Sequence, residues 1–224
     1  MRITCLFQRK ANSAIYLLWF IPYVLIYQVT NRFPVFEPRE LHYTALDAAI
    51  PFLPALLPIY LMYFPLFWWT AVRSESDATL TRFVLASHLQ LFLCCIVFVL
   101  FPVRMPQGMF YGASSLGWAD TFWRWFDGPN NCLPSLHAAN GLLFLQFNWN
   151  RPRRALHTAA ALGVVLSTVF VKQHYVVDIV AGAGVYALAA LFLSRLEIAP
   201  ARPSWLEGRK SQTRAPEHGE PMSA

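Results

Sequence analysis

The sequence has few charged residues, and this scarcity excludes an ordinary soluble domain. Aspartate, glutamate, lysine and arginine together make up 13% of the 224 residues, about half the share that is usual in soluble domains. Apolar residues account for 56% and fall in long blocks rather than in short alternating stretches. This pattern is typical of an integral membrane protein whose apolar blocks cross the bilayer as helices.

Cysteines are also few, and their spacing excludes two common uses. Cys94 and Cys95 lie inside an apolar block, while Cys5 and Cys132 stand alone. Neither CxxC nor a Cys/His ligand spacing occurs, so we expect no metal site, no cofactor and no disulfide framework. The net charge of +6 does not by itself indicate a nucleic-acid partner, and we expect none.

Six apolar segments approach the roughly 20 residues that a membrane-spanning helix needs. They cover residues 13–30, 50–72, 82–103, 135–149, 155–171 and 175–194. The fourth is short and is alternatively a re-entrant segment, while four prolines in the second predict kinks. We therefore expect an all-α, polytopic bundle of six transmembrane helices, formed by a single domain over residues 1–199. Residues 200–224 are expected to form a disordered cytoplasmic tail.

The distribution of basic residues predicts the orientation in the membrane. With the amino end in the cytoplasm, thirteen of the 18 lysines and arginines fall on the cytoplasmic side, as the positive-inside rule requires. Both termini are then cytoplasmic. In a bacterium, the chain would belong to the inner, cytoplasmic membrane.

Two connections on the outer side are long enough to carry function. The one after the first span contains Asp47, and residues 105–133 combine several tryptophans with Asp120, Arg124 and Asp127. We expect this second connection, between the third and fourth spans, to form a helix lying at the membrane interface. The alternative is a lid that reads a lipid headgroup, and one helix could serve both purposes. The four polar residues are candidates for binding a headgroup or an acceptor.

Further polar residues gather at the outer ends of the spans. They lie at the end of the third span, at the start of the fourth, in the turn before the sixth and one turn into the sixth: Arg104, Ser135, His137, Lys172, His174 and Asp178. Because the orientation rests on charge bias and span length alone, their placement on one side of the membrane is an independent indication of a shared site.

These residue types in this pattern indicate phosphoryl transfer through histidine. His174 and Asp178 are four residues apart and therefore share a helical face. The carboxylate can accept a proton from one ring nitrogen, which fixes the tautomer and leaves the other nitrogen as nucleophile. His137, from another helix, can protonate the departing alkoxide as general acid.

The remaining residues of the group suit the charge of a phosphate. Ser135 begins a helix whose free amides and positive dipole end favour phosphate oxygens. Arg104 and Lys172 can neutralise the developing negative charge, so the chemistry needs no metal. Each residue also has a plainer explanation: both cations can simply reach toward headgroups, and Asp178 can be a structural partner of Lys172.

Two segments carry a family resemblance. Residues 134–137 read P-S-L-H, and residues 167–178 read S-T-V-F-V-K-Q-H-Y-V-V-D. They resemble the second and third signatures of the type 2 phosphatidic acid phosphatase superfamily, roughly P-S-G-H and S-R-x5-H-x3-D. The resemblance extends to the six-helix layout and implies a metal-independent enzyme with a phosphohistidine intermediate. It makes His174 the nucleophile, Asp178 its orienting partner and His137 the acid.

The sequence departs from these signatures at three places. Leu136 stands where glycine is usual, Thr168 stands where arginine is usual, and the first signature offers only Arg104 without its upstream lysine. Lys172 is a candidate to replace the missing arginine. The departures resemble the bacterial inositol-phosphorylceramide-synthase-like branch, as does Asp47 with the prolines and tyrosine that follow it.

The expected activity is therefore that of a membrane lipid phosphatase or phosphotransferase. Its partners would be a lipid phosphate or phospholipid donor and, as acceptor, water or a lipid hydroxyl; the sequence leaves the choice between hydrolysis and transfer open. The alternative is a protein without enzymatic activity. It would be either a degenerate scaffold or a cytochrome in which His137 and His174 ligate haem iron.

Overall fold

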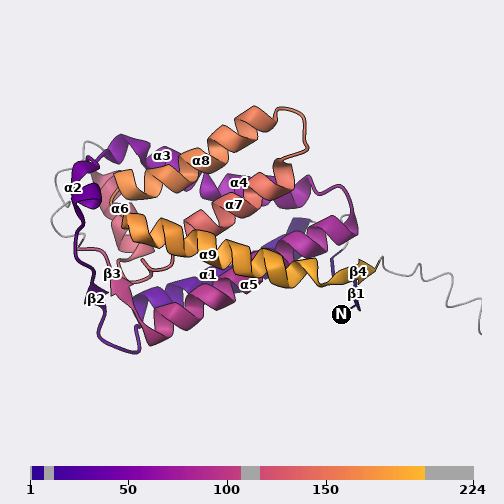
Figure 1. Ribbon diagram of the computed structural model, residues 1–224, viewed down its shortest axis with the longest axis horizontal. Coiled ribbons are helices and arrows are strands. Elements are labelled where there is room, and N and C mark those ends of the chain that lie inside the picture. The colour runs from indigo at the N-terminus through magenta and orange to yellow at the C-terminus, as the bar shows by residue number, and fades with distance from the viewer. Residues whose placement is uncertain (1, 8–12, 107–116, 200–224) are drawn as a thin grey trace, which may run out of the picture.

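The computed structural model describes residues 2–7, 13–106 and 117–199, with the backbone alone at 2, 13–18 and 118–120. Within these residues the chain is mostly helical, as expected, and the helices form an elongated bundle (Figure 1). The helices are α1 (Ser13–Arg32), α2 (Ala45–Ala49), the 3-10 turn η1 (Pro54–Leu56), α3 (Leu57–Leu61), α4 (Tyr63–Val72), α5 (Asp77–Leu100), α6 (Trp118–Asp127), α7 (Leu136–Asn148), α8 (Arg154–Phe170) and α9 (Val176–Ser194). The expected tail, 200–224, lies outside the described residues.

In the part of the chain that the structure describes, four short strands join segments that are distant in the sequence. β1 (Arg2–Thr4) pairs in parallel with β4 (Glu197–Ala199), so the two ends of the described chain meet at one end of the bundle. β2 (Arg39–Glu40) pairs in parallel with β3 (Val103–Arg104) at the other end (Figure 1). The second pair fastens the connection after α1 to the end of α5.

The proline-rich second segment is broken, as its sequence predicts. Instead of one helix, residues 54–72 form η1, α3 and α4 in succession. Proline lacks the amide that continues a helical ladder and clashes with the preceding turn. The residue before the first of these turns is joined to a neighbouring helix, because the Leu53 amide donates to the Phe170 carbonyl at the end of α8 (2.8 Å).

Three of the described helical segments are long and apolar enough to cross a membrane. They are Pro54–Val72, Asp77–Leu100 and Val176–Ser194, and Arg154–Phe170 is a shorter apolar helix. These three segments and the shorter helix correspond to four of the six expected spans. A helix, α6, also lies in the connection between the third and fourth expected spans, as predicted. The six-fold crossing and the interfacial position of α6 stay predictions.

The bundle carries apolar side chains outward and several polar ones inward. Leu25, Phe92 and Leu188 are each about 60% exposed, whereas Gln90 and Asn140 are fully buried. Water would penalise such a surface, but hydrocarbon accepts it. The Asn140 amide donates to the Tyr23 hydroxyl of another helix (3.0 Å), whereas neither polar atom of the Gln90 side chain has a partner among the described residues. The distribution is consistent with lipid around the bundle.

The central helix is α7, which contacts α4, α5, α8 and α9. It crosses α9 closely at Gly182, where an added Cβ would lie 2.3 Å from the Ser135 carbonyl oxygen and 3.0 Å from the Ala138 Cβ. Only a residue without a side chain allows this approach. The crossing brings the start of α7 against the first turns of α9.

Replacing Gly182 with alanine should therefore force α7 and α9 apart. We expect Gly182→Ala to lower the free energy of unfolding by about 1–3 kcal/mol, the usual cost of overpacking. Gly184→Ala is the matched control, because a Cβ at Gly184 meets no atom within 4 Å. Thermal unfolding in detergent measures both variants, and equal melting temperatures would contradict the tight crossing.

Candidate functional site

The candidate residues lie mainly at one end of the bundle. α7 begins there, α8 ends there and α9 begins there, next to α2 and α6 (Figure 1). The Ser135 amide donates to the Asp178 carbonyl (2.9 Å) and joins the start of α7 directly to α9. Segments that are distant in the sequence thus surround one small region.

The end of α8 determines where His174 lies. The Gln173 and His174 amides both donate to the Thr168 carbonyl, at 3.0 and 3.3 Å, and the Lys172 amide donates to the Val169 carbonyl. This is a Schellman ending, in which one residue takes a left-handed conformation that glycine usually supplies. Here Lys172 adopts it, with φ of 55°. The turn reverses the chain and points His174 back toward α7.

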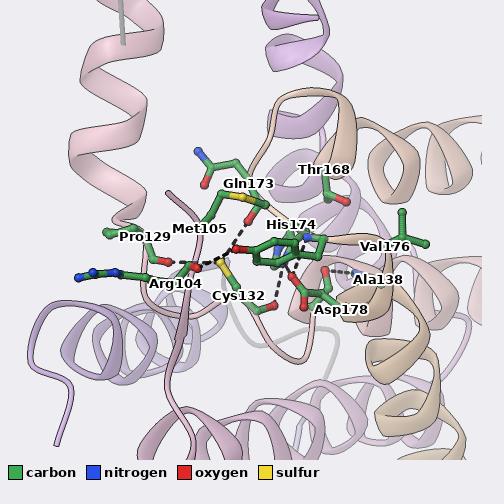
Figure 2. A network of polar contacts seen from close by, with 12 residues as sticks. Arg104, Met105, Pro129, Cys132, Ala138, Thr168, Gln173, His174, Val176 and Asp178 are labelled. Carbon is green, nitrogen blue, oxygen red and sulfur yellow. Dashed lines mark hydrogen bonds and ion pairs between the residues drawn. The ribbon is translucent and has the colours of Figure 1, made fainter. Parts of the chain in front are cut away.

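The contacts of His174 fix its tautomer. Its Nδ1 lies 2.8 Å from the Cys132 carbonyl oxygen and 3.3 Å from Asp178 Oδ2 (Figure 2). A carbonyl oxygen only accepts, so Nδ1 carries the proton. In the neutral ring, Nε2 then holds the free lone pair. Asp178 is itself fully buried, and the same Oδ2 accepts the Tyr175 amide (2.8 Å).

His137 faces His174 from the first turn of α7. The centroids of the two rings are 6.0 Å apart. Tyr60 stacks on His137 with centroids at 4.3 Å, and Tyr63 packs against it at 4.5 Å. His137 is only 7% exposed. Its buried Nε2 has no hydrogen-bond partner among the described residues. The two imidazoles are close enough for one phosphate ester to contact both.

Ser135 begins α7 as expected. Its Oγ accepts the Ala138 amide (3.2 Å) and its carbonyl accepts the Ala139 amide (3.1 Å). Within the described part of the chain, no hydrogen bond from the Leu136 or His137 amide to another residue is present. These two donors, at the positive end of the helix dipole, suit an anion.

Lys172 and Asp47 together fasten α2 to the turn before α9. The Lys172 ammonium donates to the Asp47 and Ile50 carbonyls, at 3.0 and 2.6 Å. Asp47 forms a capping box at the start of α2 with the N-cap Thr44, and its Oδ1 accepts the Val176 amide (2.8 Å) at the start of α9. Lysine has three donors, so one remains for a phosphate oxygen. Both oxygens of Asp47 are engaged in structure.

The pKa values of Asp47 and Lys172 are shifted by their surroundings. Burial opposes ionisation of Asp47, but the hydrogen bonds from Thr44 and Val176, together with the charge of Lys172, outweigh it and lower the pKa of Asp47. Burial lowers the pKa of Lys172, and the charge of Asp47 opposes that shift. The folded structure therefore favours the ionised form of Asp47.

The structure does not bring the Arg104 side chain to the histidines. Its Nε forms an ion pair with Glu40 (3.0 Å), with both side chains nearly half exposed. Figure 2 shows the guanidinium extending away from His174. The backbone is nearer, because the Tyr175 hydroxyl donates to the Arg104 carbonyl (3.3 Å).

Two of the α6 candidates are buried, and the third is not described. Arg124 donates to the Val171 carbonyl (3.0 Å), and its guanidinium lies over the Phe52 ring. Asp127 accepts hydrogen bonds from Tyr27 and Tyr60, and burial raises the pKa of Asp127 against their effect. The Asp120 side chain lies outside the described residues.

A cavity of about 40 Å³ adjoins His137. It is lined mostly by aromatic side chains of α1, α4 and α6, and Asp127 is among its walls. Among the described residues, no three His, Cys, Asp or Glu side chains are grouped so as to hold a metal ion.

Sequence reasoning missed three contributors to this geometry. Cys132 acts through its carbonyl, which every residue type possesses, so no signal in the sequence could reveal it. Tyr60 and Tyr63 enclose His137 from the broken second segment. The sequence shows that the two tyrosines are three residues apart, but only the path of the broken helix brings them to His137 on α7.

A comparison with protein families identifies the class of this fold and site. The family model of the PAP2 superfamily matches residues 42–192, well over half of the chain. The chain belongs to this superfamily. Its members are generally phosphatases, and membership fits a membrane phosphatase or phosphotransferase that acts on lipid phosphates. No curated protein matches the chain.

The lowered pKa of Asp47 predicts a pH-dependent contribution to stability. A carboxylate whose pKa falls on folding stabilises above its unfolded pKa of about 3.9 and loses this effect as the pH falls through its folded value. We expect Asp47→Asn to lower the free energy of unfolding by about 1 kcal/mol at pH 7, the typical value of a cap. The difference from wild type should shrink below about pH 4.

Melting temperatures in detergent at several pH values measure this effect. Glu37→Gln removes an exposed carboxylate from the same connection and should change little at any pH. A deficit of Asp47→Asn that stays constant down to pH 3 would show that the charge of Asp47 contributes nothing.

Proposed function

We propose that this protein is a membrane-embedded lipid phosphatase or phosphotransferase that works through a phosphohistidine, without a metal. The proposal rests on the two acceptors that His174 Nδ1 faces, which are the Cys132 carbonyl oxygen and the Asp178 carboxylate. It leaves Nε2 as the nucleophilic nitrogen, and His137 faces it from α7.

In the first step, His174 Nε2 attacks the phosphorus of a lipid phosphate ester. The N–P bond forms, the ester P–O bond breaks, and His137 donates a proton to the departing alkoxide. Asp178 and the Cys132 carbonyl stabilise the positive charge that develops on the His174 ring. The Leu136 and His137 amides and the remaining donor of Lys172 would hold the phosphoryl oxygens.

In the second step, an acceptor hydroxyl attacks the phosphorus of phosphohistidine. His137, now neutral, takes the proton of that hydroxyl, and the N–P bond breaks to return His174. With water as acceptor the product is the free phosphate group. With a lipid hydroxyl it is a new phospholipid.

Transfer to a lipid hydroxyl is favoured by the surroundings of His137. Its ring is almost completely buried between Tyr60 and Tyr63, beside a cavity with mainly aromatic walls. Such walls restrict water and accept apolar groups, which disfavours hydrolysis of the intermediate. Likeness to the inositol-phosphorylceramide-synthase-like branch supports the same assignment. By the charge bias, the site would face the outer side of the membrane.

Replacing His174 with alanine should abolish turnover. We expect a loss on the order of 10⁴ in rate for His174→Ala and of roughly 10²–10⁴ for His137→Ala. Rapid denaturation after mixing with a lipid carrying radiolabelled phosphate should trap label on the wild-type chain. His157→Ala, on α8 at the opposite end of the bundle, is the control and should label normally. Label that persists in His174→Ala would reject the nucleophile.

A product assay separates hydrolysis from transfer. Purified protein in lipid, given a labelled phospholipid donor and either ceramide or diacylglycerol, should form a new labelled phospholipid and little free phosphate. Turnover should persist in a metal chelator, and its loss would contradict the metal-free mechanism.

The haem alternative has a direct optical test. The cavity beside His137, about 40 Å³, is smaller than a porphyrin needs, so we expect no Soret band from the purified protein. A Soret band that disappears in His137→Ala would favour the cytochrome.

A further inference from the structure

A second lipid-compatible feature lies at the end of the bundle away from the histidines. It is a groove of about 820 Å³ between α4 and α8. The end of α4 and the start of α8 lie at the opposite end of the bundle from α2 and α6 (Figure 1). We call it the α4–α8 groove.

Both walls of the groove change from apolar to basic in the same direction. Along α4 and the two residues that flank it, the wall runs from Met62 through Leu66 and Trp69 to Arg73, positions that share one helical face. On α8, it runs in the reverse chain direction from Ala160 to Arg153. Because the two helices are antiparallel, the basic ends of both walls meet.

The length of the apolar part matches one leaflet of a membrane. Met62 and Arg73 are eleven residues apart, which at 1.5 Å per residue corresponds to roughly 16 Å along a helix. Half of a hydrocarbon core of about 30 Å is nearly the same length. Met62, Trp69 and Leu156 are each more than 40% exposed, so an acyl chain can lie against them.

The basic end has the charge to select an anion. Arg73, Arg151 and Arg153 line it with His157, against one acidic residue, Glu75. The Arg73 guanidinium lies over the Trp69 ring, 4.8 Å from the centroid. Arg153 takes a left-handed conformation, with φ of 62°, which is costly for a residue with a Cβ. Arginine forks bind phosphate oxygens in pairs.

We propose that the α4–α8 groove binds an anionic phospholipid, with its acyl chain along Met62, Leu66 and Leu156 and its headgroup phosphate on Arg73, Arg151 and Arg153. The occupant is anionic because the groove's arginines outnumber its one carboxylate. This site is separate from the histidine site, since the two lie at opposite ends of α8. It does not depend on the proposed reaction.

Native mass spectrometry of the full chain in detergent tests the proposal. With phosphatidylglycerol and phosphatidylcholine of identical acyl chains present together, phosphatidylglycerol should be retained preferentially. Arg153→Gln should weaken its binding about fivefold, and Arg73→Gln similarly, as expected for each basic residue near an anionic lipid. Arg39→Gln, which removes an exposed arginine at the histidine end, should bind like wild type.

Two outcomes would overturn the proposal. One is equal retention of both lipids by the wild type, and the other is unchanged phosphatidylglycerol binding in both arginine variants. His174→Ala should retain phosphatidylglycerol as the wild type does. Loss of the lipid in His174→Ala would place the bound lipid at the histidine site and would also refute the proposal.

Fluorescence provides a test that leaves every arginine in place. Acyl-brominated phosphatidylglycerol, at low fraction in phosphatidylcholine vesicles, should quench wild type more than Trp69→Phe, because Trp69 lines the groove. Brominated phosphatidylcholine at the same fraction should show a smaller difference between the two proteins. Equal differences for the two lipids would mean that the groove has no preference for negative charge.

Discussion

The contact between the start of α7 and the first turns of α9 is the constraint on which the site depends. The Ser135 amide bonds to the Asp178 carbonyl, and Gly182 lies against the Ser135 carbonyl. Through this contact, the helix that carries His137 takes a fixed position relative to the turn that carries His174. A side chain at Gly182 would separate the imidazoles without touching either, because the helices transmit a displacement along their length.

Much of the site could be predicted from the sequence, because its signals are local. The four-residue spacing of His174 and Asp178, the serine that begins α7 and the prolines of the second segment all act within a few residues. The mostly helical bundle followed from the apolar blocks, and membership of the superfamily confirmed the resemblance at that level. The reaction and its residues stay predictions, as does the six-fold crossing.

The rest could not be predicted, because it depends on the path of the chain. Arg104 follows the third span as expected, yet pairing of β2 with β3 places it beside Glu40. Asp47 is a candidate for binding a headgroup from its sequence position, and its oxygens bond to the start of α2 and the start of α9. Tyr60 reaches His137 only because its segment is divided at the prolines. Composition and spacing contain none of these distances.

The backbone of Lys172 has one further consequence. Its left-handed conformation would suit glycine, while the carbonyls of Asp47 and Ile50 require an ammonium. No standard residue meets both demands: glycine would relax the backbone but lacks the cation, and arginine would keep a cation without the compact ammonium. Glycine at position 172 would therefore exchange backbone strain for the loss of the ammonium contacts that hold α2 against the turn before α9.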